Sequence, residues 1–417
     1  MRPNGWLTTL ASQEAWRELF EPAPEQREAA GYGHTLAEIC QQPETWTGTA
    51  RQVIKARAGL AESLKDSRWL MITGSGSSQY AGECLHPALQ VELGMPTLTL
   101  GGGWLLMDGM RAVPPARPAL LVSLARSGDS PESSGVVELF LEAEPCVKHL
   151  IITCNARGRL ATCFGSDPRV MVLPLDARTN DQSLVMTSSF TNMVIATRAL
   201  GFLGDIGAFE KLVDGLASAA KLLLLHQTGV LAGVARRSFK KAVFLASGCR
   251  YGAARESALK MLEMNSGRIS TMAETYLGLR HGPMCVIDRE TLVVCFLASD
   301  PLTRAYEEDL LAELNHKELG ARKLIVGADI PSALLNEDDV TLEIPGVAAL
   351  GDANVPVLDV MVGQLLAFFR CLAEDLWPDK PVTNVINRVV ESFTIYPNKQ
   401  LTRKETYASP RHRRTQS

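Results

Sequence analysis

Short apolar runs recur along the first half of the chain, and each is followed by turn residues and then by a helical pattern of apolar positions. The runs lie at residues 68–73, 118–124, 149–154 and 170–174. Their length and their content of leucine and β-branched residues are typical of strands that are covered on both faces. Strands that alternate with helices predict an α/β unit built on a parallel sheet.

The same pattern returns in the second half. Candidate strands at residues 241–247, 291–298, 322–326 and 340–344 alternate with helical segments, and GCRYGAARESALK repeats the turn and helix of GSGSSQYAGECL. This indicates an internal duplication. We therefore expect an α/β protein with two tandem units, at residues 51–210 and 211–397, each a parallel sheet flanked by helices. Residues 1–50 are predicted to form a helical arm, and the polar residues 398–417 a disordered tail.

Composition excludes several classes of function. The 417 residues are 46% hydrophobic and carry a formal net charge of −4, which argues against a nucleic-acid partner but allows a phosphorylated metabolite held by local donors. The nine cysteines include no CxxC pair, as in a reduced, cytoplasmic protein. The N-terminus lacks a signal-peptide core and no apolar run approaches about 18 residues, so we expect no membrane span.

Two turns rich in glycine and serine follow predicted strands. The turn GSGSS ends at Ser78, and the turn ARSGDS holds Arg126, Ser127 and Ser130. In a parallel sheet both turns lie at the carboxyl ends of strands, where backbone N–H groups, hydroxyls and a helix N-terminus favour an anion. Ordinary turns between strand and helix use the same residues, and neither turn matches a dinucleotide fingerprint or a Walker A loop. The recurrence of the layout favours a phosphate site.

Residues 253–265 predict a helix that carries Glu256, Lys260 and Glu263 on one face. A glycine and a short apolar run separate this helix from a loop that holds Glu274 and His281 before a Gly-Pro pair. Carboxylates and imidazoles are the usual groups for proton transfer near neutral pH. On spacing alone, a solvated helical face and a turn histidine explain the same residues.

A third polar segment, TNDQSLVMTSSFTNM, precedes a predicted helix, with Thr187 and Ser188 at the helix start. Capping of the helix N-terminus is one explanation for these hydroxyls, and ligand binding is the other. Near the carboxyl end, the segment NVINRVVESFTIYPN contains Arg388.

Five motifs occur in order between residues 35 and 397: GSGSS, ARSGDSPES, MTSSF, LKMLE and LRHGP. Together they resemble the sugar isomerase (SIS) domain family, above all its AgaS branch, and also the isomerase half of glucosamine-6-phosphate synthase. The resemblance implies two tandem SIS domains, each a flavodoxin-like αβα sandwich. It also implies a homodimer or higher homo-oligomer whose site is shared between subunits, with no cofactor and no metal.

The resemblance implies a role for each candidate residue. Glu263 would move a proton between C1 and C2 of an open-chain sugar phosphate, and His281, commonly supplied by the neighbouring subunit, would help to open the ring. Glu274 and Arg388 are additional candidates. The synthase carries a lysine in its carboxyl segment, where this chain has Val390 or Glu391. The phosphate and the sugar would be held by Ser78, Arg126, Ser127, Ser130, Thr187 and Ser188.

These roles imply a cofactor-free deaminase/isomerase that converts an amino-sugar 6-phosphate to the ketose 6-phosphate and ammonia. Galactosamine 6-phosphate is the favoured substrate and glucosamine 6-phosphate the next. Two alternatives remain: plain aldose–ketose isomerisation of a non-amino sugar phosphate, and a non-catalytic SIS protein that binds a sugar phosphate to regulate a partner. The joint presence of Glu263 and His281, without a helix-turn-helix extension, favours an enzyme.

Overall fold

Two parallel five-stranded sheets form the centre of the protein. The computed structural model describes residues 5–382, 385–390 and 394–396. The first sheet, in the order β2-β1-β3-β4-β5, comprises β1 (Leu70–Gly74), β2 (Thr97–Gly101), β3 (Ala119–Ala125), β4 (Val147–Thr153) and β5 (Val170–Pro174). The second sheet, in the order β10-β9-β8-β6-β7, comprises β6 (Lys241–Leu245), β7 (Ser270–Glu274), β8 (Thr291–Phe296), β9 (Arg322–Gly327) and β10 (Val340–Glu343).

The two sheets have the same topology. When the strands of each sheet are numbered from that sheet's own first strand, both read 2-1-3-4-5, which is the flavodoxin-like order. All strand pairs are parallel, as βαβ crossovers require. The predicted α/β fold of two tandem SIS domains is therefore confirmed, and we refer to the two units as the first and the second repeat.

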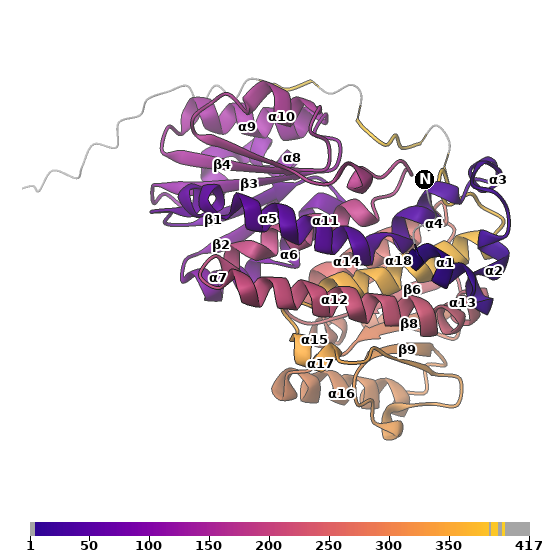
Figure 1. Ribbon diagram of the computed structural model, residues 1–417. Helices are drawn as coiled ribbons and strands as arrows, with labels where there is room; N and C mark the ends of the chain where they lie inside the picture. The colour runs from indigo at the N-terminus through magenta and orange to yellow at the C-terminus, as the bar shows by residue number, and fades with distance from the viewer. Residues whose placement is uncertain (1–4, 383–384, 391–393, 397–417) are drawn as a thin grey trace, which may run out of the picture.

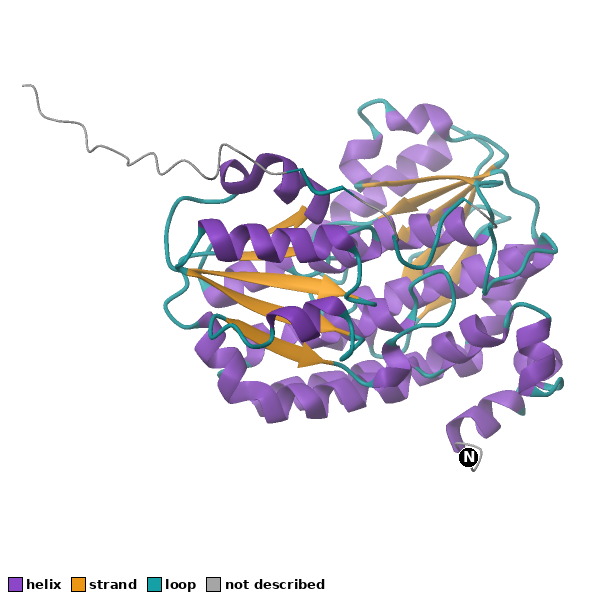
Figure 2. Ribbon diagram, turned by 90° about the horizontal axis from the view of Figure 1, so that it is seen from above, coloured by secondary structure: helices purple, strands orange, loops and turns teal. Residues whose placement is uncertain are grey.

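Helices cover both sheets and fill the space between them (Figures 1 and 2). They are α1 (Gly5–Ala11), α2 (Glu14–Phe20), α3 (Pro24–Ala29), α4 (Gly33–Cys40), α5 (Gln42–Leu64), α6 (Ser77–Glu83), α7 (His86–Leu93), α8 (Gly102–Asp108), α9 (Pro131–Ala143), α10 (Arg159–Phe164), α11 (Ser188–Arg198), α12 (Ile206–His226), α13 (Thr228–Arg236), α14 (Arg250–Met264), α15 (Tyr276–Leu279), α16 (Pro301–His316), α17 (Val347–Leu350) and α18 (Pro356–Ala373).

The helix α14 joins the two repeats. It follows β6 of the second repeat, yet it packs against α6 of the first as well as against α18. Figure 1 shows α12, α14 and α18 as a layer between the two sheets. Because α14 lies between the repeats, a side chain on it can take part in a site that the first repeat builds.

Helix α18 is the central apolar element. Of the helices in the described part of the chain, α18 alone is long and apolar enough by itself to cross a membrane, with a mean hydropathy of 1.5. In the folded protein, 89% of this helix is buried. The helices α12 and α13 pass the same test only as a pair, bent by 55°. The sequence pattern predicted no apolar run of this length. The burial of α18 explains it as a core helix that is apolar on all sides.

The N-terminal helices α1 to α4 lie along one end of α12 and α18 (Figure 1). Trp16 fixes this arm, because its indole N–H donates to the carbonyl of Leu224 at 2.8 Å and its ring lies 6.0 Å from that of Phe369. The predicted domain boundaries after residues 50 and 210 fall inside α5 and α12 and stay predictions. The predicted tail at 398–417 lies outside the described residues.

Candidate active site

A cavity of about 390 Å³ opens at the carboxyl ends of β1 and β3. This volume suits a small phosphorylated ligand, because ligand pockets usually measure roughly 300–1,000 Å³. Its walls come from the two serine-rich loops, from one face of α14 and from the described part of the carboxyl segment. Its polar lining comprises Ser75, Ser77, Ser78, Arg126, Ser127, Ser130, Glu132, Ser133, Glu263, Asn387 and Arg388.

Two glycines allow the serine loops to turn tightly at the cavity. Gly76, just before α6, has φ +57°, and Gly128, between β3 and α9, has φ +69°. A side chain would be strained at both positions. The turns bring Ser78 and Ser130 to the amino ends of α6 and α9, and within the described chain neither hydroxyl hydrogen-bonds to the protein. Free hydroxyls at two helix N-termini are suited to an anion.

Arg126 ties three segments together at one wall. Its guanidinium donates to the carbonyls of Ser183 at 3.2 Å, Leu184 at 3.0 Å and Arg388 at 2.8 Å. The Arg388 side chain in turn donates to the carbonyl of Asp181 at 2.7 Å. Both the backbone and the side chain of Arg388 therefore hold the carboxyl segment against the wall of the cavity. Burial lowers the pKa of Arg126, and all its hydrogen bonds go to neutral carbonyls. A ligand anion in the cavity would give this guanidinium a charge-assisted partner.

Glu263 enters the cavity from α14 beside a buried cation. The ammonium of Lys260 lies 2.5 Å from Oε2 of Glu263 and 3.3 Å from Oε1 of Glu256. It also donates to the hydroxyl of Ser77 at 3.3 Å. Lys260 and Glu256 are fully buried, whereas the Glu263 side chain is 22% exposed and faces the cavity. Glu263 is therefore the member of this group that a ligand can reach.

The cluster holds one cation and two carboxylates. Burial raises the pKa of Glu256 to about 7, although the charge of Lys260 acts against this shift. Burial alone would lower the pKa of Lys260, but the two carboxylates outweigh it and raise that pKa. The lysine therefore stays charged while Glu256 changes its protonation state near neutral pH.

Thr187 and Ser188 do not line the cavity. Thr187 is the N-cap residue of α11, but the carboxylate of Asp181 caps this helix by accepting the backbone N–H groups of Thr187 and Ser189, each at 2.8 Å. The hydroxyl of Ser188 also donates to Asp181. The buried carboxylate of Glu38 accepts from the Thr187 hydroxyl at 3.4 Å. The geometry thus favours the helix-start interpretation of both residues over sugar binding, and Met186 faces the cavity in their place.

His281 and Glu274 also lie outside the cavity lining. His281 is exposed between α15 and the Gly282–Pro283 turn, and its backbone N–H donates to the carbonyl of Gly278 at 3.0 Å. Glu274 is half-buried at the end of β7, and its carboxylate accepts the N–H of Thr275 at 2.7 Å. Of the predicted site residues, the chain itself brings together Ser78, Arg126, Ser127, Ser130, Glu263 and Arg388.

Lys260 is the functional candidate to which the sequence pattern assigned no role. Its signal was present, because it lies three residues before Glu263 and four after Glu256.

Within the described residues no group of three or more His, Cys, Asp or Glu side chains is placed to hold a metal ion. All nine cysteines are free.

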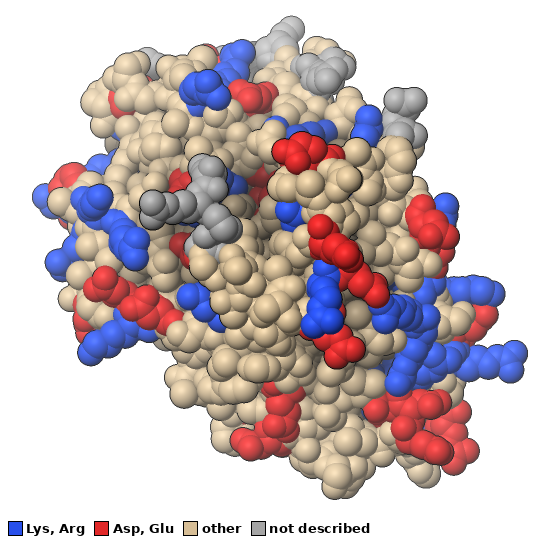
Figure 3. Space-filling model, turned by 45° about the vertical axis from the view of Figure 1, so that its right-hand side comes forward, with Lys and Arg blue, Asp and Glu red and all other residues tan. Residues whose placement is uncertain are grey.

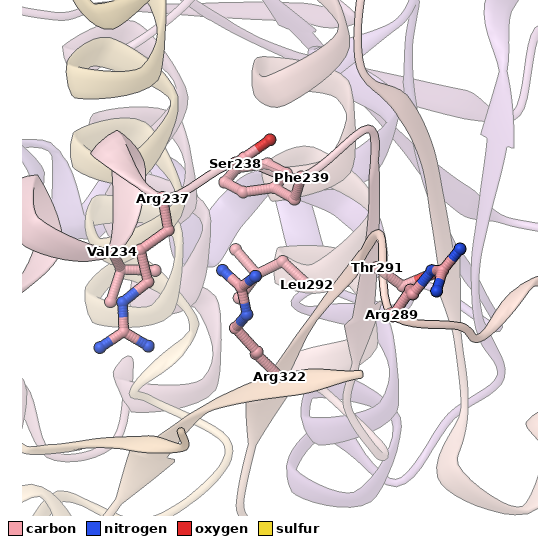
Figure 4. Close-up of a pocket in the computed structure, with 8 residues that line it drawn as sticks. All are labelled: Val234, Arg237, Ser238, Phe239, Arg289, Thr291, Leu292 and Arg322. Carbon is pink, nitrogen blue, oxygen red and sulfur yellow. The ribbon is translucent and has the colours of Figure 1, made fainter. Parts of the chain in front are cut away.

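Two other surface features differ from this cavity. A hollow of about 10 Å³ lies beside β8 and β9, between Val234, Leu292 and Arg322, and is too small for more than a water molecule (Figure 4). Figure 3 shows basic and acidic side chains interspersed over one face of the molecule rather than gathered into a field of one sign. The serine-lined cavity is therefore the candidate active site.

The fold and the cavity define a protein with two tandem SIS domains and a hydroxyl-rich cavity at the carboxyl edge of the first sheet. No family model matches the chain. The chain is 36% identical over 373 residues to an AgaS protein of Streptomyces coelicolor, and the match covers 87% of this chain and 95% of that protein. It is 33% identical over 371 residues to the D-galactosamine-6-phosphate deaminase AgaS of Escherichia coli, with the same shares covered.

A solved structure agrees with these relatives. The crystal structure of tagatose-6-phosphate ketose/aldose isomerase from Escherichia coli superposes with a TM-score of 0.78 at 30% identity, covering 88% of this chain and 97% of that one. The chain therefore belongs to the AgaS family of SIS domain proteins.

Proposed function

We propose that this protein is a cofactor-free deaminase/isomerase of an amino-sugar 6-phosphate, with galactosamine 6-phosphate as the favoured substrate and glucosamine 6-phosphate as the next. The observation that carries the proposal is the carboxylate of Glu263 in the same cavity as two serine loops suited to a phosphate. Membership of the AgaS family supports it, because a relative with 33% identity is named as a galactosamine-6-phosphate deaminase.

In the proposed reaction, Ser78, Ser127, Ser130 and Arg126 hold the phosphate, and this remote binding orients C1 and C2 of the open-chain sugar. Glu263 removes the proton from C2, the electron pair forms an enolamine between C1 and C2, and the oxygen on C1 takes up a proton from water. The same carboxyl returns a proton to C1 while the nitrogen gives up a proton to water, which leaves a hydroxyl on C1 and an imine at C2. Water then adds to C2 and ammonia departs, giving the ketose 6-phosphate.

Lys260 serves this proton transfer as a positioning residue. Its ammonium, 2.5 Å from Glu263, holds the carboxylate in one orientation toward the cavity. Glu256 and Ser77 fix the lysine from behind.

A second copy of the chain is proposed to complete the site with His281. This histidine is exposed and does not line its own cavity, as expected for a group that acts in a neighbouring subunit. Mixing Glu263→Gln with His281→Ala chains tests the arrangement. Random assembly of dimers leaves about one quarter of the sites intact if the two residues come from different chains. No recovery on mixing two inactive variants would place both residues in one chain, whereas full activity of the His281→Ala chain by itself would assign His281 no role.

The function itself is tested by ammonia release from galactosamine 6-phosphate and from glucosamine 6-phosphate. We expect release by the wild type, a loss of about 10²–10⁴-fold in Glu263→Gln because the general base is gone, and little change in Glu142→Gln, an exposed glutamate on α9. Unchanged release by Glu263→Gln would overturn the role of Glu263.

Plain aldose–ketose isomerisation is the second candidate, because the solved relative with 30% identity is named as a tagatose-6-phosphate ketose/aldose isomerase. The same residues would serve, with a hydroxyl at C2 instead of an amine. Conversion of a non-amino aldose 6-phosphate without ammonia release from either amino sugar would favour this candidate. We further propose that the protein acts in the cytoplasm, with neither nucleic acid nor membrane as a partner.

A further inference from the structure

The second repeat has loops at the same two topological positions that build the cavity in the first. The loops of the first repeat follow β1 and β3, and those of the second follow β6 and β8. Gly76 and Gly248 occupy matching positions in the first pair of loops, with φ of +57° and +56°. Pro131 and Pro301 begin the helices α9 and α16 that follow the second pair. The duplication thus extends to the backbone turn of the first pair of loops and to the proline that begins the helix after the second pair. The second loop itself is shorter in the second repeat, at residues 297–300 against 126–130, and the left-handed turn of Gly128 has no counterpart there.

A carboxylate of the chain itself occupies the second-repeat loops. Asp352 accepts the backbone N–H of Ser299 at 2.8 and 2.9 Å and that of Asp300 at 2.9 Å, directly before α16. The neighbouring N–H of Ala298 donates to Glu307 at 2.7 Å. Three successive amides that could face an anion at this helix start are therefore already bonded to carboxylates.

A buried arginine completes this arrangement where the first repeat has a free hydroxyl. Arg250 follows Gly248 by two residues, as Ser78 follows Gly76. Its guanidinium forms a bidentate pair with Asp359, at 2.7 Å for both bonds, and lies 3.5 Å from Asp352. The arginine side chain is 1% exposed. Asp352 thus receives two backbone N–H groups and a cationic neighbour, which is the environment of a bound phosphate.

We infer that the carboxylate of Asp352 takes, in the second repeat, the place that a ligand phosphate takes in the first, so that each chain binds a single sugar phosphate. The filled loops have a second consequence. Arg250 is the first residue of α14, and its pair with Asp359 fixes the start of the helix that presents Glu263 to the first repeat. The inference rests on the proposed function in taking the first-repeat loops as the phosphate site.

Calorimetric titration with galactosamine 6-phosphate measures the number of sites. Turnover is prevented by using Glu263→Gln as the parent chain. We expect one site per chain, and no saturable binding when Ser127→Ala and Ser130→Ala are added. Two sites per chain, or saturable binding that survives the two serine changes, would overturn the inference. Absence of binding in the parent itself would contradict the proposed function instead, and the next experiment would still decide the inference.

The second experiment empties the second-repeat loops. Asp352→Ser is made in the chain that also carries Ser127→Ala and Ser130→Ala, so that inorganic phosphate cannot act through the first repeat. We expect a lower melting temperature that inorganic phosphate raises by several degrees, because the anion replaces the lost carboxylate. Asp352→Ala, which also vacates the loops, serves if the serine variant does not fold.

The matched control is Asp205→Ser. Asp205 caps α12 by accepting the N–H of Ala208 at 3.0 Å, but within the described part of the chain it forms no ion pair. This variant is expected to melt earlier than its parent and to show no response to phosphate. If phosphate raised the melting temperature of the Asp352 variants no more than that of the control, or not at all, Asp352 would not stand in for a ligand anion.

Discussion

Replacement of Glu256 by glutamine should change the pH dependence of stability by a predictable amount. Burial raises the pKa of Glu256 in the folded protein from 4.5 to about 7. A raised pKa means that the folded state binds the proton more tightly than the unfolded state does. The stabilising contribution is therefore fully present below pH 4.5 and is lost as the pH rises through about 7. At about 1.4 kcal/mol for each unit of pKa, the loss amounts to about 3 kcal/mol.

Glu256→Gln removes this titration and leaves the other buried acids in place. Glu38, with its pKa raised to about 8 by burial and by Asp181, and Glu307, with its pKa raised to about 7 by burial, titrate equally in both proteins and cancel in the difference. Measured at one protein concentration, the free energy of unfolding of the variant relative to the wild type should rise by about 3 kcal/mol between pH 5 and pH 8.

The assay is urea unfolding followed by tryptophan fluorescence at pH 5, 6, 7 and 8, with Glu142→Gln as the exposed control. The reasoning would be refuted if the difference in the free energy of unfolding between Glu256→Gln and the wild type did not vary with pH. It would mean that Glu256 is ionised in the folded protein at all these pH values, because a carboxyl that stayed protonated throughout would make the difference rise even more steeply with pH.

Two further variants test the walls of the cavity. Lys260→Met leaves Glu263 without its cation. We expect the free energy of unfolding to fall by about 3–5 kcal/mol and, in the protein that remains folded, kcat to fall by about 100-fold. An unchanged kcat would remove Lys260 from the mechanism. Arg126→Gln removes the hydrogen bond to the carbonyl of Arg388 and removes a positive charge near the proposed phosphate. We expect KM to rise by about tenfold with a smaller change in kcat, and trypsin to cleave faster after Arg388. An unchanged KM together with an unchanged cleavage rate would contradict the role of Arg126.

Much of the fold was accessible from the sequence because the buried strands are short, continuous apolar runs that end in turn residues. The strand β2 (Thr97–Gly101) was missed. Its pattern of Thr and Leu is only partly buried, since β2 is an edge strand, and it lacks the continuous apolar character of β1 or β3. The helix α14 was predicted within a few residues of its bounds, because no glycine or proline interrupts its second half.

The site was accessible only where local sequence determines geometry. Ser78, Ser127 and Ser130 lie in turns whose layout follows from strand, glycine and helix. Thr187 and Ser188 start a helix as their sequence suggests, but the group that caps this helix is Asp181. Only the folded loop shows that their hydroxyls bond to buried carboxylates and do not line the cavity. Tertiary contacts of this kind leave no periodic signal in the chain.

The same limit applies to the second repeat. The resemblance between GCRYGAARESALK and GSGSSQYAGECL revealed the duplication, but the sequence could not show that the second pair of loops is filled. Asp352 lies about 50 residues from the amides that it accepts, and Arg250 reads as an ordinary helix-start residue until its burial is known. The pairing of distant charges is a property of the packed structure.

The most direct test of the central claim follows the hydrogen at C2. Galactosamine 6-phosphate labelled with deuterium at C2 is incubated with the wild type and with Glu263→Gln, and loss of the label from C2 is followed by NMR together with ammonia release. The account predicts that the wild type removes the label and releases ammonia at matching rates, and that Glu263→Gln, although it still binds the sugar phosphate, does neither. Removal of the label by Glu263→Gln at the wild-type rate would contradict the account, because another group would then be the base.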